Sequence, residues 1–467
     1  INDKLDSQSS QDLIDKEGIK RFLTDKSTSR KLRQHQWVNA RDFVYVDSIL
    51  KEVGGLSYRL CYYRAHKSQP ERLIKWVHAK PRQLDDEALL LFSKGQEDGI
   101  PKATSISQRN LLAQLLQLQQ QLPFASLKST LSSHPYYSGI GLFLGLLLPL
   151  ISGQTIITYP IENKLEHLIR LIDSHSVELA FTSPNLLHQL LSNPPDTKAT
   201  NSLRYLISSG ALLNASLREK VESHLQVKLL NAYTLTESGA LVCIEQEAKQ
   251  EQADALRNKQ QNRRTMCPVG HVLLGTALRI GKPYQSDLRV ATGELGSLWL
   301  KGPSIAHAQQ EWVNTGDIAS MNEAGLVSIE GRRRRFSRIG QELISHEAVE
   351  QLLYRYFRLA TNQGRKLAVI GINIKGQERL VMLSAAHTRF EPNDQVTMRY
   401  GLSNMKYPFS WSPSEVILVR PIPQLSNGQL DYKQCCQIAY QALGVDIPVE
   451  LRTPSPTSHE TNHQEQA

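Results

Sequence analysis

Short apolar runs alternate with amphipathic stretches along most of this chain. Strand and helix candidates follow one another at 155–159, 165–173, 177–182, 203–208, 217–224 and 227–231. Short apolar runs bounded by turn residues are typical of buried strands, and apolar residues three or four positions apart are typical of helices. Strands that alternate with helices predict an α/β fold with a largely parallel sheet covered on both faces.

A buried-strand run at 85–93 is followed by a glycine-containing loop and a predicted amphipathic helix. The loop contains Gly95, Gly99 and Lys102, and the helix carries leucines at positions 111, 112, 115, 116, 118 and 122. A loop between a strand and a helix can cradle phosphate, because its amides and the helix N-terminus direct positive partial charge at the anion. A plain surface loop is the alternative.

Three other apolar stretches contribute to the prediction. Residues 43–46 and 58–63 have the composition of short strands. Residues 140–151 (IGLFLGLLLPLI) are shorter than the roughly 20 residues that a membrane-spanning helix needs, and they contain Pro149. We expect a buried helix there, with peripheral membrane contact as the lesser alternative.

Composition narrows the class of protein. A chain of 467 residues, 40% of them hydrophobic and 21% charged, has material for two or three domains and is neither a miniprotein nor wholly disordered. Its formal charge of +9 suits a nucleotide, phospholipid, acidic carrier protein or nucleic acid. The five cysteines form no CxxC pair, and no signal peptide is visible. We expect a cytoplasmic protein, which could attach peripherally to the inner face of the membrane.

Four motifs then follow in order, at 231–237 (NAYTLTE), 315–318 (TGDI), 331–350 (GRRRRFSRIGQELISHEAVE) and 422–431 (IPQLSNGQLD). Together they resemble the AMP-forming acyl-activating superfamily of acyl- and aryl-CoA synthetases, luciferases and peptide-synthetase adenylation domains. The resemblance covers nearly the whole chain to about residue 445. It implies a large adenylation domain at 1–330 and a small, mobile α+β domain at 331–449. The tail at 450–467 has no apolar pattern, which predicts disorder.

Within that superfamily, residues 18–24, 43–49 and 334–352 resemble the synthetase half of bifunctional 2-acylglycerophosphoethanolamine acyltransferase/acyl-acyl-carrier-protein synthetases. This resemblance implies a fatty acid, ATP and Mg²⁺ as ligands, and the phosphopantetheine thiol of acyl carrier protein or CoA as acceptor. It also implies an upstream acyltransferase domain or subunit. The first part of the synthetase fold would precede Ile1, so that the adenylation domain is incomplete at its N-terminus.

The resemblance assigns a role to each motif residue. Tyr233 would stack on adenine, while Thr236 and Glu237 would contact phosphate and Mg²⁺. Asp317 would accept hydrogen bonds from the ribose hydroxyls, and Arg332 would reach the same sugar or the phosphate. Taken without the resemblance, these residues could be a half-buried core tyrosine, a turn aspartate and a solvated arginine.

The basic run at 332–335 has two interpretations. Arg334 falls where the superfamily has the hinge about which the small domain rotates, and Gly340 would lie beside the thiol-bearing arm of the acceptor. The run could instead be a nucleic-acid patch, but no aromatic residues interleave with it. We therefore expect no nucleic-acid partner.

The chain departs from the superfamily pattern at positions that carry the chemistry. Lys94 and Gln96 replace small or hydroxyl residues, and Asp98 adds a carboxylate that repels phosphate. Gln429 replaces the lysine that contacts the carboxylate and the α-phosphate, although Lys433 could substitute for it. Loss of one such group costs about 10² to 10³ in rate. Two hypotheses remain: a weakened ligase, or a degenerate relative that binds acyl group, nucleotide or partner without turnover.

Overall fold

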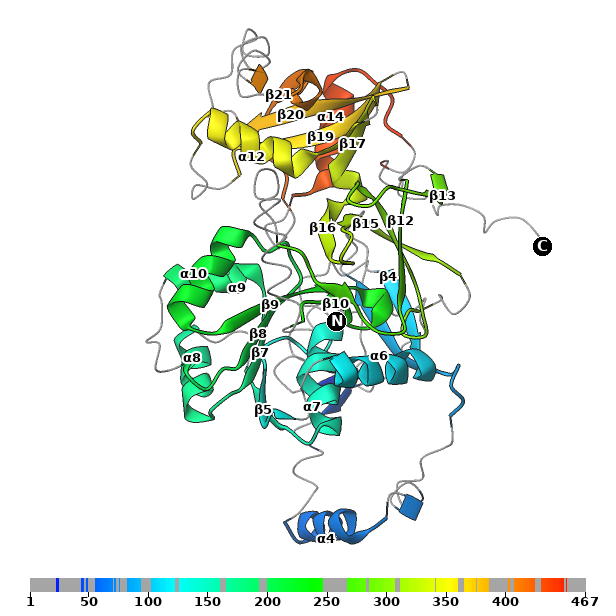
Figure 1. The fold of residues 1–467 in the computed structure, drawn as a ribbon, viewed down its shortest axis with the longest axis vertical. Helices are drawn as coiled ribbons and strands as arrows, with labels where there is room; N and C mark the ends of the chain where they lie inside the picture. Colours follow the sequence, from blue (N-terminus) through cyan, green and yellow to red (C-terminus); the bar gives the residue numbers. More distant parts are fainter. Residues whose placement is uncertain are drawn as a thin grey trace, which may run out of the picture. The chain divides into compact units, whose positions relative to one another are not determined.

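The chain divides into two compact units, each of which mixes helices with sheets (Figure 1). The first comprises Ile1–Asn163, Leu235–Leu241 and Pro303–His307, and the second comprises Lys164–Thr234, Val242–Gly302 and Ala308–Ala467. Both follow the predicted α/β class. The computed structural model describes residues 22–24, 43–45, 48, 55–69, 71–72, 75, 82–93, 102–121, 126–159, 165–192, 200–246, 267–282, 285–306, 311–340, 342–359, 365–374, 376–385, 402–403, 407–424, 430–448 and 451.

The predicted order of strand, loop and helix near residue 100 is wrong, because a second strand precedes the helix. Strand β3 (Glu87–Ser93) pairs antiparallel with β4 (Lys102–Ser107), so that Ser93 lies opposite Lys102. Helix α6 (Gln108–Gln121) begins only after β4. Thr104 and Ile106 are buried at alternate positions of β4, a period-two signal that the prediction overlooked. The loop therefore joins two strands and does not lead into a helix N-terminus.

Helix α6 buries only part of the leucine set that its spacing predicts. Leu115 and Leu118 are buried, but Leu112 and Leu116 are 47% and 58% exposed. The buried face is completed instead by three side-chain amides, those of Asn110, Gln114 and Gln117. Buried amides need hydrogen-bond partners, and the partners of Asn110 and Gln114 are backbone groups of two loops described below.

Of the two short strands predicted early in the chain, one forms. Residues 43–46 give β2 (Phe43–Tyr45), which pairs in parallel with β1 (Phe22–Thr24). Residues 58–63 lie instead in helix α4 (Gly55–Lys67). The Tyr62 ring stacks on His66 at 5.9 Å and the Lys67 ammonium lies 5.5 Å from the Tyr63 ring centre. These are contacts between residues four apart on a helix, which a strand could not make.

The apolar stretch at 140–151 forms the predicted helix. It begins as a π-helix, η3 (Ile140–Leu147), and continues as α7 (Leu148–Ile151). Phe143 and Leu144 are fully buried, whereas Leu150 and Ile151 at its end are exposed. Strands β5 (Ser129–Ser132) and β6 (Thr155–Thr158) flank it and pair in parallel. Among the described residues, no helix has both the length and the apolar character needed to cross a membrane.

The second unit begins with the predicted strand–helix alternation. Strands β7 (Leu179–Thr182), β8 (Tyr205–Ser208) and β9 (Lys228–Thr234) pair in parallel, as their buried, apolar sequences require. Helix α8 (Leu165–Ser174) precedes β7, and helices α9 (Pro184–Ser192) and α10 (Ala215–Leu225) connect the three strands. Strands β10 (Leu241–Ile244) and β11 (His271–Val272) extend the sheet beyond β9. The strands and helices predicted between residues 165 and 231 are therefore confirmed.

An antiparallel sheet follows in the same unit. Its strand order is β13-β12-β14-β15-β16. The strands span Ala277–Lys282 (β12), Gln285–Arg289 (β13), Gly296–Lys301 (β14), Val313–Met321 (β15) and Val327–Arg332 (β16). Strands β15 and β16 form a hairpin in which Asp317 lies opposite Arg332.

The C-terminal part of the second unit is a three-stranded sheet between two helices. It begins with the short helix η7 (Arg333–Arg335) and the hairpin of β17 (Phe336–Ile339) and β18 (Glu342–Ser345). The three strands of the sheet are β19 (Leu367–Ile374), β20 (Gln377–Ala385) and β21 (Glu415–Val419), and the short helix η8 (Phe409–Trp411) precedes β21. The two helices are α12 (His346–Tyr356) and α14 (Tyr432–Ala442). Alternate residues of β19 face the two helices: Ala368 and Ile370 pack with α14, whereas Leu367 and Val369 pack with α12.

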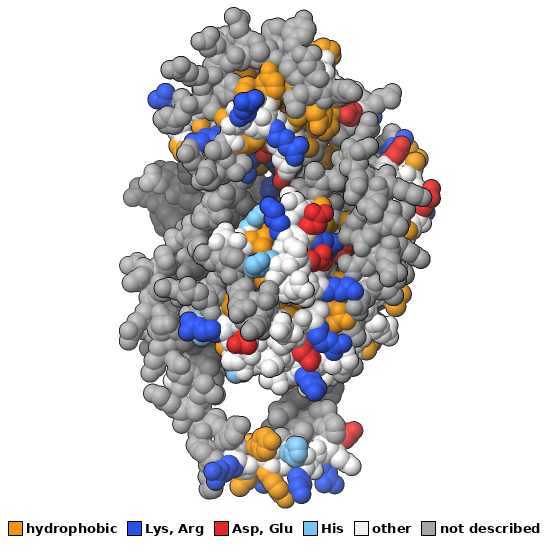
Figure 2. Space-filling model, turned by 60° about the vertical axis from the view of Figure 1, so that its left-hand side comes forward, with side chains coloured by type: hydrophobic (Ala, Val, Ile, Leu, Met, Phe, Trp, Pro, Cys, Tyr) orange, Lys and Arg blue, Asp and Glu red, His pale blue; other side chains and the backbone are white. Residues whose placement is uncertain are grey.

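The predicted domain boundary at 330/331 falls inside the second unit and stays a prediction. The tail predicted from residue 450 lies outside the described residues except for Leu451, which packs against the α14 cluster. On the face drawn in Figure 2, the described Lys and Arg side chains are distributed among other described side chains and do not gather in one place.

Candidate functional site

Three of the predicted site residues lie together in the second unit. Tyr233 is near the end of β9, and Asp317 and Arg332 face each other across the β15–β16 hairpin. The Tyr233 hydroxyl donates a hydrogen bond to Asp317 Oδ2, and Arg332 Nε lies 3.1 Å from Asp317 Oδ1. The sequence motifs at 231–237 and 315–318 are thus joined through one carboxylate.

The local backbone explains how Asp317 is turned toward these partners. Gly316 has a φ of +75°, which residues with a β-carbon rarely adopt, and its amide donates to Asn314 Oδ1 at 2.9 Å. The Asp317 amide donates to Thr315 Oγ1 at 3.1 Å. Arg332 Nη1 donates to the Thr315 carbonyl at 2.9 Å. The Thr-Gly-Asp sequence is therefore a turn that holds the carboxylate in a fixed direction.

Burial differs sharply across this cluster. The Asp317 side chain is 5% exposed, whereas the Arg332 side chain is 39% exposed. Burial, and then the Asp317 charge, raise the pKa of Tyr233 well above its usual value, so its hydroxyl stays a donor. Each carboxylate oxygen has two lone pairs; Oδ2 accepts from the Tyr233 hydroxyl and Oδ1 lies beside the Arg332 guanidinium. The cluster can accept hydrogen bonds from vicinal hydroxyls and, through Arg332, donate to an anion.

Thr236 and Glu237 lie in the first unit, in the short helix η5 (Thr236–Ser238). The Glu237 carbonyl accepts from the Ala306 amide at 2.6 Å, which ties this turn to the 303–307 segment. Both side chains are half-buried, and neither makes a hydrogen bond or ion pair with another described residue. A free carboxylate beside a free hydroxyl is a donor set that suits a hard cation such as Mg²⁺.

Two residues that the sequence analysis missed hold this turn in place. With the Gln114 side-chain amide oriented so that its nitrogen faces the two backbone carbonyls, it donates to Ser238 at 2.6 Å and to Leu241 at 3.0 Å. Asn110 Nδ2 donates to the carbonyls of Pro303 at 2.8 Å and Ile305 at 3.2 Å. The signal was the pair of amides four residues apart on a helix otherwise rich in leucine. Helix α6 therefore positions both segments that the chain returns to the first unit.

The predicted hinge region packs against an aromatic ring. The guanidinium carbons of Arg334 and Arg335 lie 6.0 Å and 5.8 Å from the ring centre of Tyr432, the first residue of α14. Arg335 also donates to Glu350 Oε1 at 2.7 Å. Lys433 follows directly on α14 and is half-buried, and Gly340 is exposed with a φ of +64°. The structure gives these residues positions, and the hinge role of Arg334 stays a prediction.

The phosphate-loop and lysine positions are not all described. Gly95, Gly99 and Gln429 lie outside the described residues, as do Lys94, Gln96 and Asp98. Lys102 is exposed at the first position of β4. Its predicted place beside a helix N-terminus is wrong, because α6 starts six residues later.

Comparison with known proteins gives a consistent family. The chain is 24% identical over 323 residues to 3-[(3aS,4S,7aS)-7a-methyl-1,5-dioxo-octahydro-1H-inden-4-yl]propanoyl:CoA ligase of Mycobacterium tuberculosis, covering 64% of this chain and 56% of the relative. It is 22% identical over 369 residues to medium-chain fatty-acid–CoA ligase of Escherichia coli, covering 74% and 60%. The chain thus spans little more than half the length of these curated relatives.

Solved structures share the fold. ATP-bound MatB from Rhodopseudomonas palustris matches with a TM-score of 0.69 and 18% identity, covering 95% of this chain and 83% of that one. The o-succinylbenzoate CoA synthetase of Bacillus subtilis with its acyl-adenylate intermediate matches with a TM-score of 0.68 and 17% identity, covering 93% and 82%. The family model described as AMP-binding enzyme matches residues 1–308, which is most of the chain. With the predicted motifs and the fold in agreement, the chain belongs to the AMP-binding enzyme family.

Proposed function

We propose that this protein is an AMP-forming acid ligase that activates a fatty acid and transfers it to a phosphopantetheine thiol. The observation that carries the proposal is the cluster of Tyr233, Asp317 and Arg332, in which one oriented carboxylate and one exposed guanidinium suit a ribose 5′-phosphate. Membership of the AMP-binding enzyme family supports it. The relatives named above are ligases that form CoA thioesters, and one is named for medium-chain fatty acids.

The reaction proceeds in two displacements. A carboxylate oxygen of the acid attacks the α-phosphorus of ATP, and the bond to pyrophosphate breaks, which leaves an acyl-adenylate. The acceptor sulfur then attacks the acyl carbon, AMP leaves, and the thiol proton passes to solvent. In this scheme Asp317 and Arg332 hold the nucleotide, and Tyr233 both orients Asp317 and offers a ring face to adenine.

Glu237 and Thr236 would hold Mg²⁺ and phosphate. Their half-buried side-chain oxygens, which have no partner among the described residues, lie on a turn fixed by Gln114 and Ala306 and fit this role. When bound, the cation would neutralise charge on the phosphates of ATP. The loop with Gly95, Gly99 and Lys102 would contribute further donors, which Asp98 partly opposes.

The finer features of the proposal rest on the sequence. Gln429 in place of a lysine predicts weakened adenylation, and Lys433 is the nearest candidate to replace the charge. The resemblance to bifunctional synthetases suggests a fatty acid as substrate, acyl carrier protein or CoA as acceptor, and an acyltransferase domain or subunit as partner. Arg334 would serve as the hinge of a small domain at 331–449.

The second candidate is a degenerate adenylation-fold protein that binds nucleotide, acyl group or partner without turnover. Gln429 is the observation that favours it, together with Lys94 and Asp98 in the phosphate loop. Only the ligase needs both the nucleotide cluster and the chemistry of the final motif, whereas the degenerate protein needs the cluster only if nucleotide is what it binds.

Fatty-acid-dependent ATP–pyrophosphate exchange separates the two. We expect slow exchange by the native chain, and an increase with Gln429→Lys because a positive charge returns to the point where carboxylate and α-phosphate meet. Gln119→Lys, at an exposed position of α6, is the matched control. Exchange that is absent from both the native chain and Gln429→Lys, while AMP still binds, would favour the degenerate protein. Addition of CoA or acyl carrier protein to the same mixture identifies the acceptor.

A further inference from the structure

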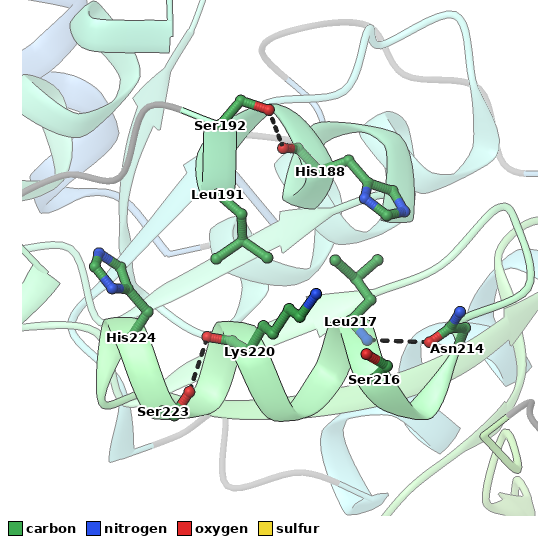
Figure 3. Close-up of a pocket in the computed structure, with 9 residues that line it drawn as sticks. All are labelled: His188, Leu191, Ser192, Asn214, Ser216, Leu217, Lys220, Ser223 and His224. Carbon is green, nitrogen blue, oxygen red and sulfur yellow. Dashed lines mark hydrogen bonds between the residues drawn. The ribbon is translucent and has the colours of Figure 1, made fainter. Parts of the chain in front are cut away.

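A groove lies between helices α9 and α10, within the second unit and away from the residues of the proposed nucleotide cluster. Its volume is about 610 Å³, within the size range of small-molecule sites. In Figure 3 the side chains of Leu191 and Leu217 point toward each other across the space between the two helices. The lining residues are His188, Leu191, Ser192, Asn214, Ser216, Leu217, Lys220, Ser223 and His224.

The groove is cationic and lacks any acidic lining residue. Lys220, His188 and His224 all line it, and none of the three forms an ion pair with another described residue. The Nε2 atom of His224 is buried and has no hydrogen-bond partner in the described part of the chain. Glu222 on the same helix is not in the lining, and it accepts from the Leu229 amide at 3.2 Å. Nothing in the lining neutralises this charge.

The polar groups of the groove include both hydrogen-bond donors and acceptors. Asn214 Oδ1 is already occupied by the Leu217 amide at 3.1 Å, which leaves its amide nitrogen to donate. Ser192 and Ser223 donate to the carbonyls of His188 at 3.0 Å and Lys220 at 3.1 Å, so their oxygens remain acceptors only. In Figure 3 the Lys220 side chain extends into the groove, toward the end where His188 and Ser216 lie. A ligand that accepts hydrogen bonds and carries negative charge satisfies the Lys220 ammonium and the Asn214 amide nitrogen.

The lining also excludes other ligand classes. A metal ion would find two histidines but no carboxylate or thiol in the lining. A purely apolar ligand would bury Lys220 and leave its charge without a partner. A phosphate group offers several strong acceptor oxygens to an ammonium, an imidazole and a hydroxyl, and Leu191 and Leu217 provide an apolar surface for a short organic part.

We propose that the α9–α10 groove binds a small soluble phosphate monoester, at a site separate from the nucleotide cluster. The proposal goes beyond the ligase function and does not depend on it. Because the groove lies between the helix that connects β7 to β8 and the helix that connects β8 to β9, an occupant would contact both helices at once.

Calorimetric titration with glycerol 3-phosphate tests the site, with glycerol as the neutral control. We expect saturable binding of glycerol 3-phosphate alone, weakened by added salt. Lys220→Gln and His188→Gln should each weaken it about tenfold, because each removes a charge-assisted contact. Lys282→Gln, an exposed lysine of β12 in the same unit, is the matched control and should leave it unchanged. Lys220 and His188 are exposed, so these variants are expected to melt at the native temperature.

Two further experiments test whether the ligand binds at the groove and not at the nucleotide cluster, and whether it is a soluble phosphate or a lipid. Asp317→Ala should bind glycerol 3-phosphate as tightly as the native chain, since the groove is separate from the nucleotide cluster. Vesicles of phosphatidylcholine with phosphatidic acid test a lipid phosphate monoester as the occupant. Binding to those vesicles that Lys220→Gln abolishes, without binding of glycerol 3-phosphate, overturns the soluble ligand. Equal loss of glycerol 3-phosphate binding in Lys220→Gln and Lys282→Gln, or no saturable binding, overturns the site.

Discussion

Two arginine–carboxylate pairs of the second unit have the same chemistry and different surroundings. Arg218 and Glu245 are 4% and 5% exposed, whereas Asp317 is 5% exposed and its partner Arg332 is 39% exposed. Arg218 also donates to the Leu229 carbonyl at 3.1 Å, and the Asn231 amide donates to Glu245 at 2.8 Å. The first pair joins α10 to strands β9 and β10 and is closed to ligands.

The comparison shows how a structural ion pair differs from a candidate binding pair. The Arg218–Glu245 pair is surrounded by the protein itself, so its charges compensate each other's desolvation and serve the fold. The Asp317–Arg332 pair keeps one charged group in contact with solvent and adds a tyrosine hydroxyl, so a ligand can join it. Breaking the first should cost stability, and breaking the second should cost binding.

The largest expected effect is therefore on the closed pair. Arg218→Ala leaves Glu245 buried without its cation, and we expect a loss of about 3 to 5 kcal/mol in the free energy of unfolding. Urea denaturation measures it. Asp317→Asn is the comparison variant and should lose less, because Arg332 can turn to water. An unfolding midpoint for Arg218→Ala equal to that of the native chain would show that the closed pair does not support the fold.

A smaller loss of stability is expected when the buried contact that is removed is a hydrogen bond between uncharged groups. Gln114→Leu removes the donor to the Ser238 and Leu241 carbonyls, and a buried polar group without a partner costs about 1 to 3 kcal/mol. Because those carbonyls flank Glu237, pyrophosphate exchange should fall as well. Gln119→Leu on the exposed side of α6 is the control. Equal stability and equal pyrophosphate exchange in both variants would show that Gln114 does not hold the turn that carries Glu237.

The smallest effect is a pH dependence of stability from a neutral buried group. His346 is fully buried against Ser337, with Nε2 at 2.8 Å from the hydroxyl, and burial and the Arg335 charge lower the pKa of His346 well below its usual value. At a pH below about 6.5, His346 is protonated in the unfolded chain but stays neutral in the folded chain. The free energy of unfolding should therefore fall as pH drops, by up to about 1.4 kcal/mol per pH unit.

Half-buried His134 adds to this trend, because desolvation lowers the pKa of His134 to about 4. Urea midpoints between pH 7 and pH 5 measure the slope, and His346→Gln should make it shallower. If the slopes of the two proteins coincide, His346 is charged in the folded state and the predicted direction is wrong.

The fold was predictable from the sequence where a single rule relates the apolar pattern to one type of element. The buried runs that became β7, β8 and β9 read clearly, because strands covered on both faces are uniformly apolar. Strand β4 was missed because only Thr104 and Ile106 carry its alternation. Helix α4 was missed because its tyrosines favour strands in isolation, while contacts four residues apart, such as Tyr62 with His66, fit a helix.

The candidate site was predictable only as a set of motifs. The resemblance brought Tyr233, Asp317 and Arg332 into one site, but which atoms bond to which depends on the register of β15 with β16. Gln114 and Asn110 could not be assigned, because their partners are backbone carbonyls nearly 200 residues away for Asn110 and more than 120 away for Gln114. Contacts to backbone leave no signature in the partner's sequence.

Calorimetric titration of AMP into the native chain and Asp317→Asn measures whether the open Asp317–Arg332 pair binds nucleotide. We predict that the native chain binds AMP and that Asp317→Asn binds it about 10- to 100-fold more weakly, since the hydrogen bonds to a charged acceptor are worth about 1.5 to 3 kcal/mol. Asp173→Asn, at an exposed position of α8, should bind as the native chain does. Equal AMP affinity in the native chain and Asp317→Asn would contradict the assignment of the open pair to nucleotide binding.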